Sequence, residues 1–271
     1  MRRHLFLILL SALALGAGAA TRETSSCRTE SLTYDVYYHW GFIWTKAGQG
    51  ILTLDDQTMA DGTHRRMGKL SAKSLSIVET LMKVRDTLEC WYTPEMVPIE
   101  YCKKTHEGSY NAVERNRYTT HWRPGAEGRK PADVALTDVH VTRWRDKKGK
   151  TSDAERRYSL SGSPAYDMLS VFYAIRALDF ATMRKGHEVR FPIFSGIKDA
   201  DYMTVQFCGP ERCELKNGKT YDAYRLELSF RSKDSDQTPL HVWLARTPDH
   251  RPLKVTISLQ RIGEIQGQIA E

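Results

Sequence analysis

The sequence predicts a mainly β protein: a single antiparallel curved sheet or half-barrel, wrapped around one main α-helix at about residues 164–184. Segments in which apolar and polar residues alternate dominate the chain, as is typical of strands with one buried face. Turn sequences such as Asp61-Gly62 and Asn217-Gly218 separate these segments, and few helical periods lie between them. Hydrophobic residues make up 41% of the 271 residues and charged residues 27%, which excludes a collagen-like or wholly disordered chain.

The first nineteen residues have the layout of a secretory signal peptide. Two arginines at positions 2 and 3 precede an apolar run from Leu5 to Leu15, and Ala17-Gly18-Ala19 offers small residues for cleavage. The apolar run is shorter than the roughly 20 residues that a membrane-spanning helix needs. The predicted organisation is a cleaved signal peptide at 1–19, a flexible segment at 20–29 and a single β-rich domain at 30–271.

The exported chain is predicted to be a soluble periplasmic protein. Cys27 follows Thr24-Ser25-Ser26, which is not the Leu-plus-small-residue motif of a lipoprotein, and no later stretch is apolar enough to span a membrane. Residues 101–160 hold 14 Lys and Arg against 8 Asp and Glu. Outside the cytoplasm such a segment would meet an anionic envelope polymer or anionic lipid headgroups rather than nucleic acid. An ordinary solvated loop around residues 145–150 is the alternative.

The spacing of the cysteines predicts two disulfide bonds. Cys208 and Cys213 flank four turn-forming residues, and Cys90 and Cys102 flank a predicted hairpin turn that would set them opposite each other. Cys27 is then left over. The chain has no CxxC motif, and its nine histidines show no HxH or HxxxH spacing, so no metal site and no cofactor are predicted.

The first predicted strand runs from Leu32 to Trp44 and carries aromatic residues on one parity. Tyr38, Trp40, Phe42 and Trp44 would share one face of this strand. They would either form the core against the helix or line an apolar groove. Further strands are predicted at 51–54, 67–72, 84–92, 97–106, 110–120, 136–145, 187–194, 201–208, 213–216, 221–231, 239–246 and 252–262.

The one long helix is predicted at about 164–184. Ser163 would cap it, and Asp167 would favour the positive end of the helix dipole. Apolar residues that include Phe172 follow at i, i+3, i+4 and i+7 spacing, so the helix is expected to pack on the concave side of the sheet. A short helical turn is predicted near Ile77.

Three blocks of the chain follow a familiar order. They are Tyr34-Asp35-Val36-Tyr37-Tyr38 with Lys46-Ala47-Gly48, Asp167-Met168-Leu169-Ser170 with Phe172-Tyr173-Ala174-Ile175-Arg176, and Arg251-Pro252-Leu253-Lys254-Val255. Together they resemble the opening, the helix and the closing strand of the bacterial domain-of-unknown-function family 3108, over roughly residues 30–265. The resemblance implies an exported β-rich protein, and more loosely a half-barrel like those that carry or receive lipoproteins. It implies no established activity and no catalytic residue.

The residues themselves do not predict a catalytic site. Ser161-Gly162-Ser163-Pro164 lacks the second glycine of a nucleophile elbow, and no phosphate-binding loop occurs. We expect an exported non-catalytic binding or envelope-assembly protein that holds a lipid, another apolar ligand or a lipidated protein in the concave face of its sheet. The expected ligand-binding residues are Tyr38, Trp40, Phe42, Trp44 and Phe172.

A hydrolase acting on envelope glycans or esters is the alternative function. Such an enzyme would need two facing carboxylates, and Asp35, Asp86 and Glu100 are the candidates. The two hypotheses differ in the site they require: an apolar concave face for the binding protein, and a polar cleft with clustered titratable groups for the hydrolase.

Overall fold

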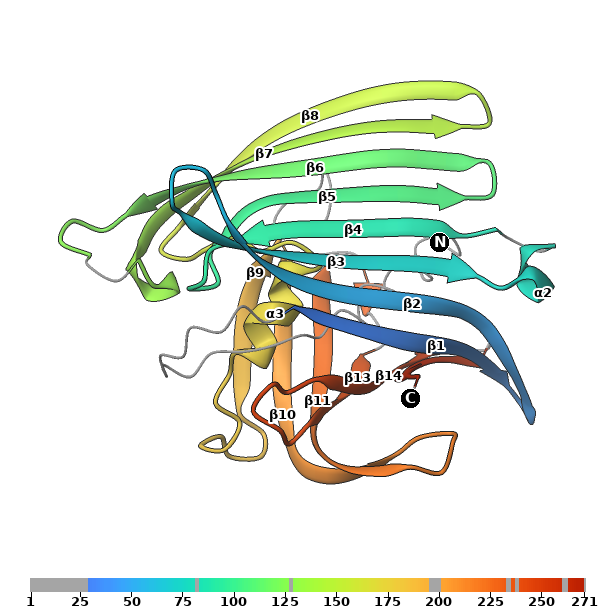
Figure 1. Cartoon of the computed structure of the whole chain (residues 1–271). Helices are drawn as coiled ribbons and strands as arrows, with labels where there is room; N and C mark the ends of the chain where they lie inside the picture. The colour runs from blue at the N-terminus through green and yellow to red at the C-terminus, as the bar shows by residue number, and fades with distance from the viewer. Residues whose placement is uncertain are drawn as a thin grey trace.

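The computed structural model of the chain describes residues 29–270 except 81–82, 127–128, 195–200, 233–234, 237–238 and 260–262. Its strands form one antiparallel sheet in the order β8-β7-β6-β5-β4-β3-β2-β1-β15-β14-β13-β11-β10-β9, with β12 beside β11 (Figure 1). β8 and β9 are the two edge strands, so within the described residues the sheet stays open. The predicted signal peptide at 1–19 and Cys27 lie outside the described residues.

The elements have the following bounds. The strands are β1 (Glu30–Trp40), β2 (Ile43–Thr58), β3 (His64–Ser74), β4 (Arg85–Tyr92), β5 (Pro98–Glu107), β6 (Tyr110–Trp122), β7 (Val134–Lys147), β8 (Lys150–Ser161), β9 (Glu188–Ile193), β10 (Asp201–Glu214), β11 (Thr220–Ser232), β12 (Ser235–Asp236), β13 (Leu240–Ala245), β14 (Pro252–Leu259) and β15 (Gly263–Ile269). The helices are α2 (Ser76–Glu79), α3 (Ser170–Arg176) and a 3-10 turn at Pro131–Asp133.

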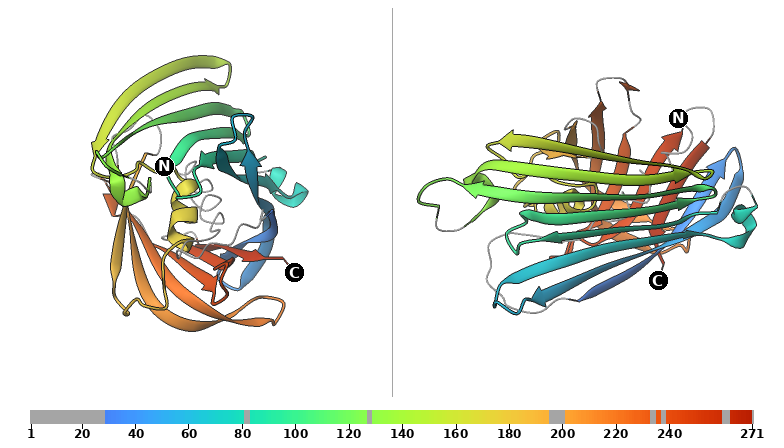
Figure 2. Two further views of the ribbon diagram at one scale, coloured as in Figure 1. Left: turned by 60° about the vertical axis from the view of Figure 1, so that its left-hand side comes forward. Right: turned by 90° about the horizontal axis from the view of Figure 1, so that it is seen from above.

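The sheet consists of two meanders that meet at the N-terminal strand. Strands β1 to β8 each pair with the next strand along the chain, and the strands from β9 to β15 do the same except that β12 is passed over. β1 joins the two meanders by pairing with β15, from Tyr34 opposite Ile269 to His39 opposite Glu264. Figure 2 shows that the sheet curves, so that β4–β8 and β10–β13 lie on opposite sides of one interior.

Residues with left-handed backbone conformations make the tight turns. Gly62 and Gly218 have φ angles of 80° and 81°, which confirms the turns predicted at Asp61-Gly62 and Asn217-Gly218. Lys148 and Gly149 also have positive φ angles, as both central residues of a type I′ hairpin must. Residues 148–149 are therefore the two-residue loop of a hairpin between β7 and β8, and the segment at 145–150 is not an ordinary solvated loop. β8 is not among the strands predicted from the sequence.

Each strand has an inner face towards the common interior and an outer face on the other side. On β4, for example, Asp86, Leu88, Cys90 and Tyr92 are buried, and the residues between them are more exposed. Because side chains alternate along a strand, the register of the sheet assigns every other residue to the same face. The inner face carries most of the hydrophobic core.

The predicted helix is wrong in length. α3 spans only Ser170–Arg176, about two turns, and all seven residues are buried. Asp167 holds its start, because the Oδ1 atom accepts hydrogen bonds from the N–H groups of Leu169 and Ser170, each at 2.8 Å. The predicted cap Ser163 instead donates its hydroxyl hydrogen to the carbonyl of Pro164. So short a helix cannot form an axis for the sheet, which is therefore not wrapped around one main helix. The predicted turn near Ile77 is confirmed as α2.

Both predicted disulfides are contradicted, since Cys90, Cys102, Cys208 and Cys213 are free thiols. In the β4–β5 register Cys90 lies opposite Tyr101, and Cys102 lies opposite the residue before Cys90. An offset of one residue puts the two thiols on opposite faces of the sheet. Cys208 and Cys213 both lie within β10, which continues where a hairpin tip is expected. Five residues of extended strand separate them by roughly 15 Å.

Candidate binding face inside the curved sheet

The aromatic residues predicted to line a ligand site are not brought together, because residues 32–44 form two strands. The chain reverses at Gly41-Phe42, between β1 and β2. Trp44 therefore pairs with His39 and lies with it on the outer face, whereas Tyr38 packs against the core from the inner face.

The remaining residues of that prediction are equally scattered. Phe42 lies at the tip of the hairpin with 94% of its surface exposed, and Phe172 is fully buried in α3. The side chain of Trp40 lies outside the described part of the structure. The alternation of aromatic residues thus continues through a turn and does not define one surface.

The inner face of the C-terminal meander is apolar. We define an apolar wall as one residue from each of five strands: Val205, Leu228, Leu240, Ile257 and Ile265. Each lies directly opposite the next in the register of the sheet. All five are buried, and neighbours in this position have Cβ atoms about 5 Å apart. The result is a continuous aliphatic surface across five strands.

The inner face of the N-terminal meander carries polar residues among apolar ones. We define a polar wall as the inner-face residues Asp86, Tyr101, Lys103, Glu114, Asn116, Tyr118 and Arg143 of strands β4–β7. Lys103, Glu114 and Arg143 lie opposite one another in register, so charges of alternating sign cross three strands. Figure 2 shows these strands across the interior from those of the apolar wall.

Three buried atoms of the polar wall have no hydrogen-bond partner among the described residues, one each on Asp86, Tyr101 and Asn116. Tyr101 and Asn116 are paired in register and fully buried. The Asn116 side-chain N–H donates to the Tyr118 hydroxyl at 3.2 Å, but the Asn116 carbonyl and the Tyr101 hydroxyl are unsatisfied. Leaving a buried polar group unpaired costs about 1–3 kcal/mol. A donor and an acceptor therefore point into the interior from adjacent strands.

These tyrosines keep their protons. Burial raises the pKa of Tyr101 and of Tyr118 well above the usual value, and the negative charge of the Asp167 carboxylate raises both further. Asp167 itself is not available to a ligand, since it accepts hydrogen bonds from two backbone N–H groups and from the Ser170 hydroxyl at 2.7 Å. The two phenols are thus neutral hydrogen-bonding groups at physiological pH.

Asp86 brings a carboxylate to the same face. Its Oδ1 atom accepts a hydrogen bond from the backbone N–H of His106 at 2.8 Å, and its Oδ2 atom is buried without a partner in the described structure. Burial raises the pKa of Asp86 to about 6. The sequence signal for this residue is its position: it falls on the parity of Leu88, Cys90 and Tyr92, where apolar residues are expected.

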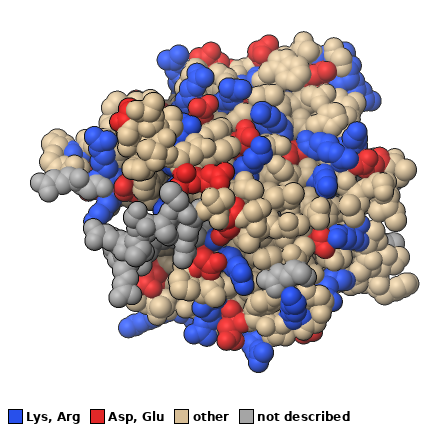
Figure 3. All heavy atoms as spheres, viewed as in Figure 1, with Lys and Arg blue, Asp and Glu red and all other residues tan. Residues whose placement is uncertain are grey.

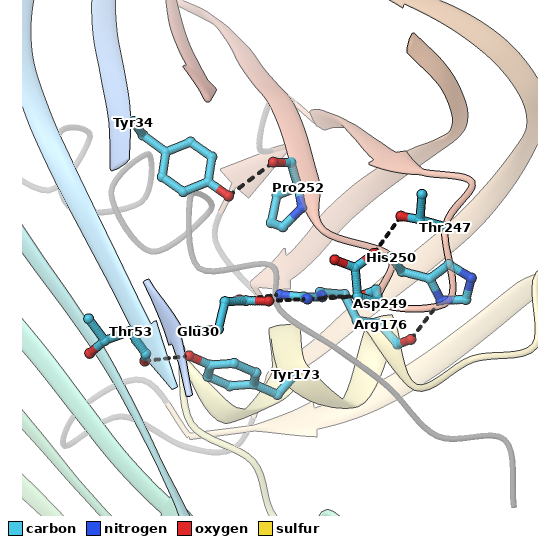
Figure 4. Close-up of polar contacts among 9 residues, drawn as sticks. All are labelled: Glu30, Tyr34, Thr53, Tyr173, Arg176, Thr247, Asp249, His250 and Pro252. Carbon is cyan, nitrogen blue, oxygen red and sulfur yellow. Dashed lines mark hydrogen bonds and ion pairs between the residues drawn. The ribbon is translucent and has the colours of Figure 1, made fainter. Parts of the chain in front are cut away.

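A buried polar network fixes α3 beside these walls (Figure 4). The Arg176 guanidinium is fully buried and forms a bidentate ion pair with the Glu30 carboxylate of β1, at 3.1 and 3.0 Å. It also donates to the Asp249 carbonyl at 2.9 and 2.7 Å. Removing one partner of such a pair costs about 3–5 kcal/mol. We therefore assign this network a structural role.

α3 also packs against β2 and β3 of the N-terminal meander. The Tyr173 hydroxyl donates to the carbonyl of Thr53 on β2 at 3.2 Å. A Cβ atom on Gly68 of β3 would lie 2.3 Å from the Tyr173 ring, so only glycine allows this approach. α3 is thus held by β1, β2 and β3 of the N-terminal meander and by the loop between β13 and β14 of the C-terminal meander.

The carboxylates required by the hydrolase alternative are not brought together. Asp86 lies on the inner face, whereas Glu100 precedes the inner-face residue Tyr101 and so lies on the outer face. Asp35 is also on the outer face and pairs with Lys46 at 2.7 Å. Among the described residues, no group of three or more His, Cys, Asp or Glu side chains is arranged to hold a metal ion.

The outer face of β6–β8 mixes charges of both signs. Glu155 forms an ion pair with Arg157 and contacts the His140 imidazole at 2.8 Å, and the Asp138 carboxylate contacts the His121 imidazole at 2.9 Å. A shallow depression of about 500 Å³ on these strands is lined mainly by the outer-face residues Val113, Arg115, Thr142, Trp144, Asp153 and Glu155. Figure 3 shows acidic and basic groups interspersed over the face that it presents. The basic excess of residues 101–160 is therefore spread among acids and does not form one cationic surface on that face.

Comparisons with known proteins show a family and no assigned activity. A family model described as "Protein of unknown function (DUF3108)" matches residues 33–268. No curated protein matches the chain. Among solved structures, the chain is similar to a "Beta-barrel-like Protein of Domain of Unknown Function DUF1849 from Brucella abortus", with 8% identity and a TM-score of 0.49. That match covers 90% of this chain and 96% of the other.

Proposed function

The chain belongs to the DUF3108 family of unknown function, and from this premise we propose that it binds an amphipathic, lipid-like molecule in the interior of its curved sheet. The acyl part would contact the apolar wall, and the headgroup would contact the polar wall. The protein would act as an exported, non-catalytic carrier or assembly factor of the cell envelope, for a free lipid or for the lipid of a lipidated protein.

The buried, unsatisfied atoms of Tyr101 and Asn116 are the observation that supports this proposal. A structural core ordinarily pairs such groups, because burial without a partner is unfavourable. What sets Tyr101 and Asn116 apart is that, among the described residues, an unpaired donor and an unpaired acceptor lie opposite each other in register. A headgroup that offers one acceptor to the Tyr101 hydroxyl and one donor to the Asn116 carbonyl would satisfy both. Esters, amides and hydroxyl groups of lipids supply these functions.

The arrangement of the two walls also supports an amphipathic ligand over a wholly apolar one. Aliphatic residues of five strands line one side of the interior, and polar residues of four strands line the other. Such a site orients a molecule by its polar end and holds it by its apolar part, as ligand sites commonly do.

Replacing Tyr101 with Phe tests the proposal, because it separates ligand binding from stability. The variant loses a hydroxyl that has no partner in the described structure, so its free energy of unfolding should stay equal or increase by about 1 kcal/mol. Its content of bound lipid should fall about fivefold, the equivalent of one hydrogen bond. Lipid is measured by mass spectrometry of organic extracts from protein purified without detergent after expression of the full chain.

Tyr92→Phe is the matched control. Tyr92 is equally buried, and its hydroxyl also lacks a partner among the described residues. Its ring, however, packs against the Tyr173 ring of α3, with the ring centroids 5.3 Å apart. This variant should keep the wild-type lipid content. Wild-type protein that carries no lipid and binds no fluorescent fatty acid would overturn the proposal, as would equal lipid content in all three proteins.

A further inference from the structure

The hairpin between β1 and β2 exposes apolar residues at its tip. Gly41 has a φ angle of 58°, which a type II′ hairpin requires at its first turn position, and Phe42 occupies the second. Phe42 is 94% exposed, and the next residue, Ile43, is 48% exposed. A turn of this kind is ordinarily polar, so a Phe-Ile pair here points to a surface that covers it.

A second exposed apolar residue lies at the same end of the molecule. Ile77 of α2 is 69% exposed. Figures 1 and 2 both place α2 and the β1–β2 tip at one end of the sheet, and the N–H of Leu75, just before α2, donates to the carbonyl of Ala47 on β2. We call Phe42, Ile43 and Ile77 the apolar rim.

An aromatic and cationic layer lies directly behind the tip. Trp44 stacks on His39, with ring centroids 4.0 Å apart and an interplanar angle of 10°. The Lys216 ammonium lies 3.6 Å from the centroid of the Trp44 ring, and the backbone N–H of Lys216 donates to Gln268. Lys216 forms no ion pair with the described residues, so its charge is available to an anion. Lys46, two residues after Trp44 on β2, is paired with Asp35.

The order of these groups is that of a segment which enters a membrane surface. Apolar side chains come first, tryptophan follows at the level of the headgroups, and a lysine reaches anionic phosphates beside it. No described helix is long and apolar enough to cross a bilayer, so contact of this kind would be at the surface.

We infer that the apolar rim docks on the surface of an anionic phospholipid bilayer, with Phe42 and Ile43 inserted and Lys216 against the phosphates. The inference stands on the exposed tip and its cation, and does not depend on what the interior of the sheet binds. It gives the end of the sheet that carries α2 a fixed orientation towards the membrane.

Vesicle binding by a tip variant tests this inference. The full chain is expressed, the purified protein is mixed with vesicles of phosphatidylglycerol and phosphatidylcholine, and binding is measured by flotation and by the tryptophan emission shift. Phe42→Ser/Ile43→Ser should bind about tenfold to a hundredfold more weakly than wild type, because two apolar side chains are no longer transferred from water into the bilayer. Lys216→Gln should weaken binding only to the vesicles that contain phosphatidylglycerol.

Ile51→Ser/Ile99→Ser is the matched control. These residues are 39% and 37% exposed on the outer face of β2 and β5, away from the tip, so wild-type binding is expected. Equal binding by the tip variant and the control would overturn the inference, and so would a wild-type protein that binds neither vesicle type. A tip variant that changes only self-association in ultracentrifugation would show that the rim contacts a second copy, which also overturns it.

Discussion

The two meanders have the same backbone architecture, but polar residues interrupt the apolar inner face in strands β4–β7 of the N-terminal one. In the C-terminal meander, the inner residues that lie opposite one another are Val205, Leu228, Leu240, Ile257 and Ile265. In the N-terminal meander, the corresponding positions include Tyr101 opposite Asn116 and Lys103 opposite Glu114. Both sets are produced by the same antiparallel register, so the difference lies entirely in the side chains.

This difference separates stability from binding. Burial of aliphatic residues stabilises the fold, and the apolar wall needs no further explanation. Buried polar atoms without partners oppose folding, and natural proteins retain such conflicts mainly at functional sites. The polar wall is therefore the part of the interior in which a ligand would be recognised, and the apolar wall is the part that holds the sheet together.

Truncations on the two walls should show the largest contrast. Leu240→Ala removes a buried side chain from the middle of the apolar wall and should lower the free energy of unfolding by about 2–5 kcal/mol. Lys103→Ala, on the polar wall, should lower it by less than about 1 kcal/mol. Urea unfolding followed by circular dichroism measures both. Equal costs would show that the two walls are one ordinary core.

The pH dependence of Asp86→Asn sharpens the contrast on the polar side. Burial raises the pKa of Asp86 from 3.8 to about 6, so between these values the folded state holds a proton that the unfolded state releases. The free energy of unfolding of the wild-type protein should therefore fall as the pH rises from about 4 to about 6 and then level off. At pH 7 the variant should be more stable than wild type by up to about 3 kcal/mol.

Urea unfolding at pH 4 and pH 7 decides this point. Asn keeps an acceptor for the His106 N–H but carries no charge, so the advantage of the variant should disappear at pH 4. The Asp167 carboxyl, whose pKa burial also raises to about 6, is present in both proteins and cancels in the difference. A variant less stable than wild type at both pH values would show that the Asp86 charge is compensated.

The smallest effect concerns the cysteines. The four described cysteines are free thiols, two in each meander, so neither half depends on a disulfide. Adding a reducing agent should shift the melting temperature by less than about 1 °C, and alkylation after denaturation should label each of these four cysteines, as read by peptide mapping. Melting that drops by several degrees on reduction would contradict the register that places Cys90 and Cys102 on opposite faces.

Local patterns in the sequence were sufficient for most of the strands and turns, since alternation and Gly-containing turns depend on neighbouring residues, but they missed β8 and divided β10 into two strands. They failed where a feature depends on register. Trp44 continues the alternation of Tyr38 in sequence, but the turn at Gly41-Phe42 puts the two on different faces. The same reason accounts for the cysteine pairs, because one residue of offset decides whether two side chains meet.

The polar wall was predictable only in part. Asp86 stands out in the sequence, since it occupies an apolar parity. Tyr101 and Asn116 do not, because their importance comes from lying opposite each other on strands whose pairing must be known first. The short α3 also could not be foreseen from its apolar spacing, which continues past Arg176 although the helix ends there.

The pairing of β1 with β15 has a consequence for how the chain acquires its structure. Nearly all other strand pairs are hairpins between neighbours in sequence, so each meander can assemble locally and quickly. The contact of Tyr34 with Ile269 joins the two ends of the chain, and it cannot form before the last strand is available. Until β15 is available, β1 is an unpaired edge strand of the N-terminal meander. Pairing of β1 with β15 should therefore set the folding rate, and the unpaired β1 edge should be the part of the intermediate most prone to aggregation.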